Sequence, residues 1–342
     1  MTQIGSHSNP DNLSWQGRSV FITGAAGFVG RWLSEKLVSQ GARVIALDWQ
    51  GKSDTTGLPL LDSKGFESIQ GRVENSEKIE RILHDAYVDT VFHLAAINVN
   101  IGTSVSPRSI FETNIRGTWS VLEACRLVPS VARIVLASSS EAEDEQKTET
   151  IKASTKIRRK RHPYQVSKIS AELVAQAYAD TYGMPIAISR SDNIYGGRDL
   201  NWNRLIPGVM RSLINGEAPV LRSDGTLARD FIYIDDIVAA YLTLAEKTGD
   251  SGVRGEIFHF ATGTNTTALD IVTQLCELTG RSDLKPVVLN KSPCERINSI
   301  RPINLERDLL GWASKIDLRE GLQLTANWYK KYFHESGHNP EY

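Results

Sequence analysis

The sequence predicts an α/β fold in which a doubly wound parallel-sheet Rossmann domain is joined to a smaller C-terminal α/β domain. Two observations lead to this prediction. Short strand-like segments alternate with segments of helical periodicity between residues 19 and 189, and a run of glycines separates the first strand from the first helix. Such alternation is typical of a parallel sheet with helices on both faces. The 342 residues suffice for two domains of about 150 residues each.

The first βαβ unit occupies residues 19–48. SVFIT is a short β-branched and aromatic run, GAAGFVG is a turn, and RWLSEKLVSQ carries apolar residues at helical spacing. Gly41 ends that helix, and ARVIALD forms the second strand. Further alternation predicts a helix over 76–87, a strand over 90–93, a helix over 108–127, a strand over 133–137, a helix over 163–182 and a strand over 186–189.

After Arg190 the alternation gives way to a segment rich in Gly, Asn and Arg. A helix over 206–214 follows, and RDFIYIDDIVAAYLTLAEK indicates a strand and then a helix with an acidic start. EIFHFA indicates one more buried strand, and residues 266–280 a helix that ends at a glycine. We therefore predict a dinucleotide-binding domain over 17–190, to which 228–262 returns, and a second domain over 191–227 and 263–335.

The composition is that of an ordinary globular protein. Lys and Arg total 39 against 40 for Asp and Glu, which gives a net charge of −1, and 41% of the residues are hydrophobic. These values disfavour a nucleic-acid-binding protein and an acidic disordered chain. Cys125, Cys276 and Cys294 lack the spacing of zinc ligands or of a disulfide framework, which predicts reduced, buried thiols and no metal site.

No segment indicates targeting to a membrane. No apolar run approaches the ~18 residues of a membrane span, and the first sixteen residues lack the apolar segment of a secretory signal. We expect a cytoplasmic protein with no membrane or nucleic-acid partner. Residues 1–16, rich in Ser, Asn and Gln, are expected to form a disordered leader.

The glycine turn carries a dinucleotide-binding pattern. Gly24 suits the tight turn, Gly27 lets the backbone approach a pyrophosphate at the helix N-terminus, and Gly30 allows close helix–strand packing. Asp48 ends the second strand 18 positions after Gly30, where a carboxylate can bind both ribose hydroxyls. Because no cation beside Asp48 would offset repulsion of a 2′-phosphate, we predict NAD and not NADP. The alternative is that Asp48 only forms the turn.

A second pattern places acid/base chemistry near the sheet. Tyr164 and Lys168 are four residues apart, so one face of the predicted helix carries both side chains. An ammonium and a cationic nicotinamide both favour the phenolate, which makes Tyr164 a feasible acid/base for a carbinol proton. Ser139 closes a strand at the edge where such sheets bind ligands, and it would hydrogen-bond the same hydroxyl. The alternative for this Tyr/Lys pair is a solvated helix surface.

Over about residues 17–330 the chain resembles the extended short-chain dehydrogenases/reductases that modify nucleotide-activated sugars. The resemblance rests on motifs in the family's order: TGAAGFVG, FHLAA, ASSS, PYQVSK, RSDNIYGG, NRLIP and RDFIYIDD. It is nearest to the branch of CDP-glucose 4,6-dehydratase-like NAD-dependent epimerases and dehydratases. The resemblance implies that the second domain binds substrate, and that two copies pair through helices 108–127 and 163–182 as a homodimer.

The resemblance also implies roles for individual positions. The catalytic set would be Ser139, Tyr164 and Lys168. NAD would contact Gly24, Gly27, Phe28, Val29, Gly30, Asp48, Trp49, Arg72, Val73, Leu94, Ala95, Ala96, Asn114, Ser138, Tyr164 and Lys168. A nucleoside diphosphate sugar would contact Ser140, Asn193, Asn203, Arg204, Leu205, Arg229, Arg296 and Arg301. Guanidinium groups suit a diphosphate because they bind it bidentately, although any of these arginines could instead form a surface ion pair.

The sequence departs from its nearest branch after Ser139. That branch usually has Asp-Lys where Ser140 and Glu141 stand, and Ser-Ser-Glu is instead similar to the Thr-Ser-Glu of GDP-mannose 4,6-dehydratases and UDP-glucuronate decarboxylases. This similarity implies that Glu141 removes a C5 proton and assists loss of the C6 hydroxyl. The alternative is that Glu141 belongs to a solvated acidic run, 141–145, in a charged loop that extends to Arg161.

These patterns predict an enzyme that oxidises a nucleoside diphosphate sugar at C4. A 4,6-dehydratase is the leading hypothesis, because Glu141 supplies the extra acid/base group. A C4 epimerase needs only Ser139, Tyr164 and Lys168, and the missing Asp-Lys pair favours it. A uronic acid decarboxylase ranks third. A non-catalytic NAD-binding module on the same fold ranks last, because Tyr164 and Lys168 are both present.

Overall fold

The computed structural model describes residues 14–49, 63–98, 105–142, 162–191, 193–290 and 304–335. Its largest element is a seven-stranded sheet in which every paired strand is parallel. The strand order is β10 (Ile257–Phe260), β6 (Ile186–Ser191), β5 (Arg133–Ala137), β4 (Thr90–His93), β1 (Ser19–Thr23), β2 (Arg43–Asp48) and β3 (Phe66–Gln70). The order reverses between β1 and β4, which confirms the predicted doubly wound α/β fold.

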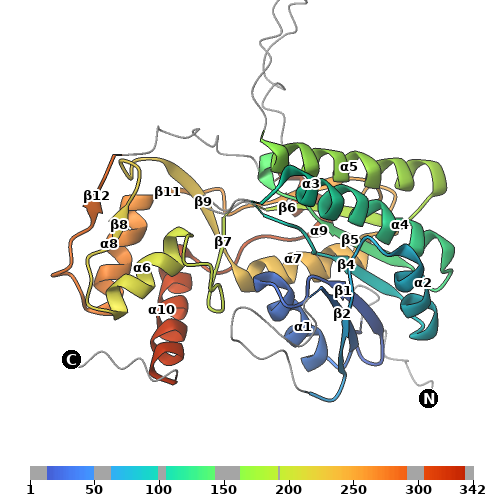
Figure 1. Ribbon diagram of the computed structural model, residues 1–342, viewed down its shortest axis with the longest axis horizontal. Coiled ribbons are helices and arrows are strands. Elements are labelled where there is room, and N and C mark those ends of the chain that lie inside the picture. Colours follow the sequence, from blue (N-terminus) through green and yellow to red (C-terminus); the bar gives the residue numbers. More distant parts are fainter. Residues whose placement is uncertain are drawn as a thin grey trace, which may run out of the picture.

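Helices cover both faces of this sheet (Figure 1). On one side lie α1 (Phe28–Ser39), α7 (Ile234–Lys247) and α9 (Asn304–Leu310), and on the other α2 (Ser76–Asp85), α4 (Gly117–Leu127) and α5 (Pro163–Tyr182). Along β1, Val20 and Ile22 belong to one hydrophobic core and Phe21 to the other. Because successive side chains of a strand alternate between faces, a sheet buried on both sides requires nearly continuous apolar strands, as SVFIT and RVIALD provide.

A smaller lobe lies beside the sheet, at the left of Figure 1. It contains α6 (Leu205–Ile214), α8 (Ala268–Thr279), α10 (Leu318–Glu335) and the short pair β8 (Val220–Leu221) and β12 (Val287–Val288). A three-stranded sheet, β11 (Asn265–Thr267), β9 (Ala228–Tyr233) and β7 (Asn193–Tyr195), stands between this lobe and the large sheet. Within the segment 228–262, β10 pairs with β6 in the large sheet, whereas β9 pairs with β7 and β11.

The helix predicted over 108–127 is interrupted. The structure has α3 (Pro107–Phe111), a π-turn (Glu112–Arg116) and then α4. Single π-turns inside a helix are often found at functional sites. This π-turn carries Asn114, which is buried and whose side chain contacts both the loop after β4 and α5. These tertiary bonds offset the irregular turn, and no local pattern in the sequence indicates them.

The predicted leader ends earlier than expected. Trp15 is only 4% exposed, and its ring lies 6.2 Å from that of Phe92 in the core of the large sheet. The Arg18 side chain holds this segment by donating to the Ser14 carbonyl oxygen at 2.8 Å. Burial of the Trp15 indole removes a large apolar surface from water, which favours folding. Residues 14–16 therefore belong to the fold. Residues 1–13 lie outside the described ranges.

Two smaller findings concern composition. Cys125 and Cys276 are buried free thiols, as predicted, and Cys294 lies outside the described residues. Within the described ranges, no helix has the length and apolar character needed to cross a membrane.

Candidate active site

The glycine turn after β1 is as tight as its sequence predicts. Gly24 has φ +74°, and a Cβ there would lie 2.8 Å from the Ala95 amide nitrogen, in the loop after β4. A Cβ on Gly30 would lie 2.3 Å from the Gly24 carbonyl oxygen. Gly27 caps α1 without a side-chain hydrogen bond, which leaves the first amides of the helix for an anion. The turn therefore fits the pyrophosphate of a dinucleotide.

Asp48 lies across from this turn, at the end of β2. Its Oδ2 accepts a hydrogen bond from the Ala26 amide at 3.2 Å, which holds the carboxylate beside the turn. The Trp49 side chain that follows is 63% exposed.

Two further predicted cofactor residues follow β3. Val73 packs on α4 so closely that a Cβ on Gly117 would lie 2.5 Å from its Cγ2. The guanidinium of Arg72, a predicted cofactor residue, donates to Glu74 at 3.1 Å.

The predicted catalytic side chains meet where β5 ends and α5 begins. Helix α5 starts at a capping box between His162 and Gln165, which places Tyr164 in its first turn and Lys168 one turn later. Lys168 Nζ donates to the Ala137 carbonyl oxygen at 2.9 Å, at the last residue of β5. Beyond β5, the Ser139 hydroxyl lies near enough to the Tyr164 side chain to lower the pKa of its phenol.

Burial governs the protonation of this pair. It raises the pKa of Tyr164 to about 12, and the nearby Glu141 carboxylate adds to this rise, while Ser139 and Arg204 oppose it. Burial lowers the pKa of Lys168 to about 8. The phenol is therefore held protonated in the protein alone, and the positive charges around it decide how readily it gives up its proton.

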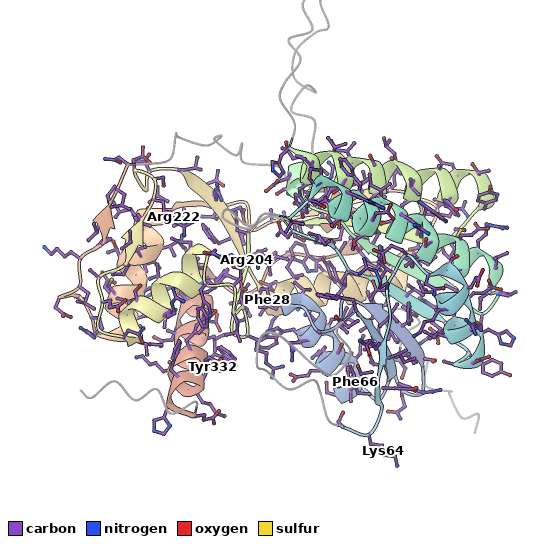
Figure 2. All side chains as sticks on the ribbon, in the orientation of Figure 1. Phe28, Lys64, Phe66, Arg204, Arg222 and Tyr332 are labelled. Atoms are coloured by element: carbon purple, nitrogen blue, oxygen red, sulfur yellow. The ribbon has the colours of Figure 1, made fainter. Side chains whose placement is uncertain are left out.

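The two charged side chains that act on the pKa of Tyr164 come from different parts of the chain: Glu141 precedes the tyrosine in the sequence and Arg204 follows it. Glu141 lies in a short turn, Ser140–Ala142, where its amide donates to Ser139 Oγ at 3.2 Å and its side chain is exposed. Arg204 precedes α6 and bonds Asp199 at 3.0 Å. Figure 2 shows Arg204, with Phe28 of α1, at the junction between the two lobes. The site is thus formed by both lobes.

The remaining predicted substrate residues are dispersed. Asn193 Nδ2 donates to the Asp230 carbonyl oxygen at 3.0 Å, which ties β7 to β9 beside Arg229. The Asp230 carboxylate accepts the amides of residues 262–264 and so holds the loop before β11. Asn203 is exposed and Leu205 packs against the core. Arg296 and Arg301 lie outside the described residues, as does loop 143–161.

Sequence reasoning missed a buried ion pair under the site. Arg190 of β6 binds Glu172 with two hydrogen bonds, of 2.7 and 2.5 Å, and the Glu172 side chain is only 4% exposed. Glu172 lies one helical turn beyond Lys168, and its charge opposes the lowering of the lysine pKa. The four-residue spacing after Lys168 is the signal that could have identified it.

The burial of the Lys168 ammonium should lower the stability of the folded protein. The lowering of its pKa from 10.5 to about 8 corresponds to about 3 kcal/mol of unfavourable burial, of which the bond to Ala137 returns about 1 kcal/mol. We expect Lys168→Met to raise the free energy of unfolding by about 2 kcal/mol at pH 7. Between pH 8 and 10.5 the unfolded wild type holds a proton that the native state lacks, so its stability rises with pH.

The difference between Lys168→Met and wild type should therefore be constant below pH 8 and shrink toward pH 10.5. Urea unfolding at a series of pH values measures it. A variant that is less stable than wild type at pH 7, or a difference that does not change above pH 8, would contradict the buried ammonium.

The parallel sheet, the glycine turn and the Ser139–Tyr164–Lys168 arrangement together define a short-chain dehydrogenase/reductase. The sequence profile of the NAD dependent epimerase/dehydratase family matches residues 20–260. The chain therefore belongs to this family of extended short-chain dehydrogenases/reductases, and its cofactor is NAD. This confirms the family resemblance and the prediction of NAD made from Asp48 and the glycine turn.

Individual relatives differ in reaction. An Arabidopsis thaliana protein described as a trifunctional UDP-glucose 4,6-dehydratase, 3,5-epimerase and reductase is 24% identical over 97% of this chain, which spans 49% of that protein. The chain thus covers about half the length of this relative. The solved UDP-glucose 4-epimerase of Thermotoga maritima, with UDP-glucose, is 28% identical at a TM-score of 0.79 and covers 92% of this chain and 99% of its own.

A second solved structure represents the other reaction. The dTDP-glucose 4,6-dehydratase of Streptomyces venezuelae, with NAD and TYD bound, is 26% identical at a TM-score of 0.76, and the match covers 93% of this chain and 98% of that one. Both reaction types therefore occur among relatives of similar distance.

Proposed function

We propose that this protein is an NAD-dependent 4,6-dehydratase of a nucleoside diphosphate hexose. The observation that supports dehydration is the place of Glu141. Its carboxylate is near enough to Tyr164 to be the second-largest cause, after burial, of the raised tyrosine pKa, and yet its side chain is exposed toward solvent. Elimination of water needs an acid/base group besides Ser139, Tyr164 and Lys168, and among the described residues Glu141 is a carboxylate that lies near Tyr164.

In the proposed reaction, Tyr164 accepts the proton of the C4 hydroxyl while Ser139 hydrogen-bonds the same oxygen. NAD, when bound, supplies the chemistry of taking a hydride from C4 and giving it back at C6. The 4-ketone formed acidifies the C5 proton. Glu141 removes that proton and delivers one to the departing C6 hydroxyl, so one water leaves. Once C6 has regained the hydride, the proton that Tyr164 took from the C4 hydroxyl is returned to C5, and the sugar becomes a 4-keto-6-deoxy hexose. The charge of Arg204 lowers the pKa of Tyr164 and so favours the phenolate.

The proposed substrate class follows from the relatives and from the arginines at the lobe junction. The solved relatives were determined with UDP-glucose and with TYD. Arg204 is held by Asp199 close to Tyr164, and Arg229 lies on the sheet between the lobes. Guanidinium groups at the junction suit the diphosphate of a nucleotide sugar whose hexose extends toward Tyr164.

A C4 epimerase is the second candidate. It requires the same oxidation by Ser139, Tyr164 and Lys168, followed by return of the hydride to the opposite face of C4. The similarity to the Thermotoga maritima epimerase, at a TM-score of 0.79, favours it. In that reaction Glu141 has no step to perform.

Product analysis distinguishes the two reactions. The purified protein is incubated with NAD and with CDP-, GDP-, UDP- and dTDP-hexoses, and the sugars are followed by proton NMR. Dehydration predicts a new C6 methyl signal and a C4 ketone with at least one nucleotide sugar. An inverted C4 carbon with the C6 hydroxyl retained would refute dehydration and support the epimerase.

We further propose that the chain forms a homodimer through α4 and α5. These helices pack side by side and expose large apolar side chains, among them Trp119 at 40% and Leu173 at 61%. Burial of such side chains between two copies is favourable at about 25 cal/mol per Å². We expect twice the monomer mass of 37.9 kDa in light scattering.

The double variant Trp119→Glu/Leu173→Glu should shift this mass to that of the monomer, because it places charges in an apolar contact. Leu324→Glu, at a similarly exposed leucine of α10 in the smaller lobe, is the matched control and should remain dimeric. Monomeric wild type, or a double variant that stays dimeric, would contradict this interface.

A further inference from the structure

A buried chain of polar side chains crosses the large lobe beneath the proposed site. It starts at Thr23, the last residue of β1, and continues through His93 of β4 and Thr118 of α4 to Asn114 in the π-turn and Ser167 of α5. Each of these five side chains belongs to a residue that is at most 2% exposed. The large majority of polar groups buried so deeply in proteins are satisfied by hydrogen bonds, as these are.

The direction of the hydrogen bonds around His93 follows from one carbonyl group. Thr118 Oγ1 lies 2.7 Å from the Asn114 carbonyl oxygen, which can only accept, so the threonine donates its hydrogen there. His93 Nε2 lies 3.1 Å from the same Oγ1 and must therefore be the donor to it. Nδ1 is then the acceptor, and it takes the hydrogen of Thr23 Oγ1 at 2.7 Å. Thr23 Oγ1 in turn accepts the Ala95 amide at 3.3 Å.

The histidine in this arrangement is neutral. Burial, together with the charge of Lys168, lowers the pKa of His93 to about 3. A protonated ring would carry a hydrogen on both nitrogens and would lose its bond from Thr23, whose hydrogen would point at another hydrogen. In the neutral Nε2–H tautomer, Nε2 donates to Thr118 and Nδ1 accepts from Thr23, so both ring nitrogens are hydrogen-bonded.

The other end of the chain reaches the proposed catalytic helix. The Asn114 side-chain oxygen accepts a hydrogen bond from the Ile97 backbone amide at 2.7 Å, and its Nδ2 donates to the Ile97 carbonyl oxygen at 3.0 Å. The same Nδ2 also donates to Ser167 Oγ at 2.9 Å. Ser167 Oγ donates to the Tyr164 carbonyl oxygen at 2.7 Å. One continuous set of bonds thus joins the loop 95–97, beside the glycine turn, to the first turn of α5.

We propose that His93 is a positioning residue, which acts through Thr118 to fix the π-turn at Asn114. By this route it sets the loop 95–97 of the NAD groove and the backbone of Tyr164 in one rigid unit. Two features support this role. The local side-chain bond of the π-turn is the solvent-exposed Arg116–Glu112 ion pair at 3.1 Å, a kind of pair that contributes little stability. Thr118, by contrast, is buried, and it both shares the His93 bond and satisfies the Asn114 carbonyl group. The expected effect on turnover rests on the proposed function. The expected tautomer of His93 and the expected change in NAD affinity do not depend on it.

The tautomer is tested on the wild-type protein. Nitrogen NMR of the protein with labelled histidine, with His93 assigned by comparison with a His93→Gln variant, reports which ring nitrogen carries hydrogen. We expect the neutral Nε2–H form of His93 at all values between about pH 5.5 and 9, a range in which a free histidine would titrate. A His93 ring that protonates in this range, or that carries its hydrogen on Nδ1, would overturn the assignment.

The positioning role is tested with Thr118→Val, which keeps the side-chain shape and removes the hydroxyl, and with Thr118→Ser as the conservative control. We expect Thr118→Val to raise the Kd for NAD and to lower kcat about tenfold or more with little change in KM for the sugar, because small displacements of reacting groups cost rate steeply. Thr118→Ser should stay within about twofold of wild type, since its hydroxyl preserves both bonds.

A merely structural role predicts a different outcome. In that case Thr118→Val would lower the melting temperature while the Kd for NAD and kcat, measured well below that temperature, would match those of Thr118→Ser, and the proposal would be wrong. If wild type converts none of the nucleotide sugars, the proposed function fails, and the NMR and the NAD affinities still decide the role of His93.

Discussion

Glu141→Gln is expected to stop the loss of water while C4 oxidation continues. Glutamine has nearly the same shape as glutamate but cannot take the C5 proton, and general acid/base groups contribute about 10²- to 10⁴-fold in rate. We expect dehydrated product to fall by that factor. Oxidation at C4, seen as absorbance of reduced cofactor in a single turnover, should persist. Exchange of the C5 proton with deuterated solvent should fall together with the dehydrated product.

The same variant should change the titration of the tyrosine in a known direction. The Glu141 carboxylate raises the pKa of Tyr164, so its removal lowers that pKa and shifts the pH profile of C4 oxidation toward lower pH. Glu143→Gln is the matched control, because it removes a neighbouring acid of the run 141–145. Full dehydration by Glu141→Gln, or equal losses in both variants, would show that Glu141 acts only as one charge among several.

Tyr164→Phe is expected to abolish turnover by every proposed route. It removes the phenol oxygen that we propose accepts the C4 proton, while the ring keeps its place in a site where the residue is 8% exposed. We expect kcat to fall by about 10²- to 10⁴-fold, with neither reduced cofactor nor epimerised sugar formed. The affinity for NAD, measured by calorimetry, should change little, because the glycine turn and Asp48 are untouched.

Tyr178→Phe supplies the control for this substitution. Tyr178 lies on the same helix, and its hydroxyl bonds Glu123 at 3.1 Å on the side of α4, away from Ser139. Loss of that bond should leave kcat within about twofold of wild type, since a single such hydrogen bond contributes about 1 kcal/mol to stability and this one does not reach the site. Substantial turnover by Tyr164→Phe would instead assign proton transfer to another group.

Much of the fold could be predicted because its signals are local. The strands 90–93 and 133–137 and the helix 163–182 lie at the predicted residues, since an apolar run or a capped helical period identifies each one by itself. The strand β3 and the helix α10 were not anticipated. In β3, Phe66–Gln70 is only half-buried and carries no clear alternation. The helix α10 did carry a start signal that was overlooked, because Asp317 precedes it and accepts a hydrogen bond from the Glu320 amide at 2.9 Å.

The candidate site, like the fold, combines features that local sequence patterns predict with features that depend on tertiary packing. The spacing of Tyr164 and Lys168, and the glycines before α1, are patterns within a few residues of each other, so the sequence predicts them directly. The approach of Arg204 to Tyr164 joins residues forty positions apart and depends on how the smaller lobe packs against the large sheet. No local pattern encodes that packing.

The sequence by itself determined the class of fold and the cofactor, and it predicts the Ser/Tyr/Lys set, because periodicity, glycine spacing and capping act within one or two elements. Only the tertiary structure decided that Trp15 belongs to the core, that the helix before α4 opens into a π-turn at Asn114, and that His93 is locked between two threonines. The physical reason is that burial and hydrogen-bond direction depend on partners brought together from β1, β4, α4 and α5, which are far apart along the chain.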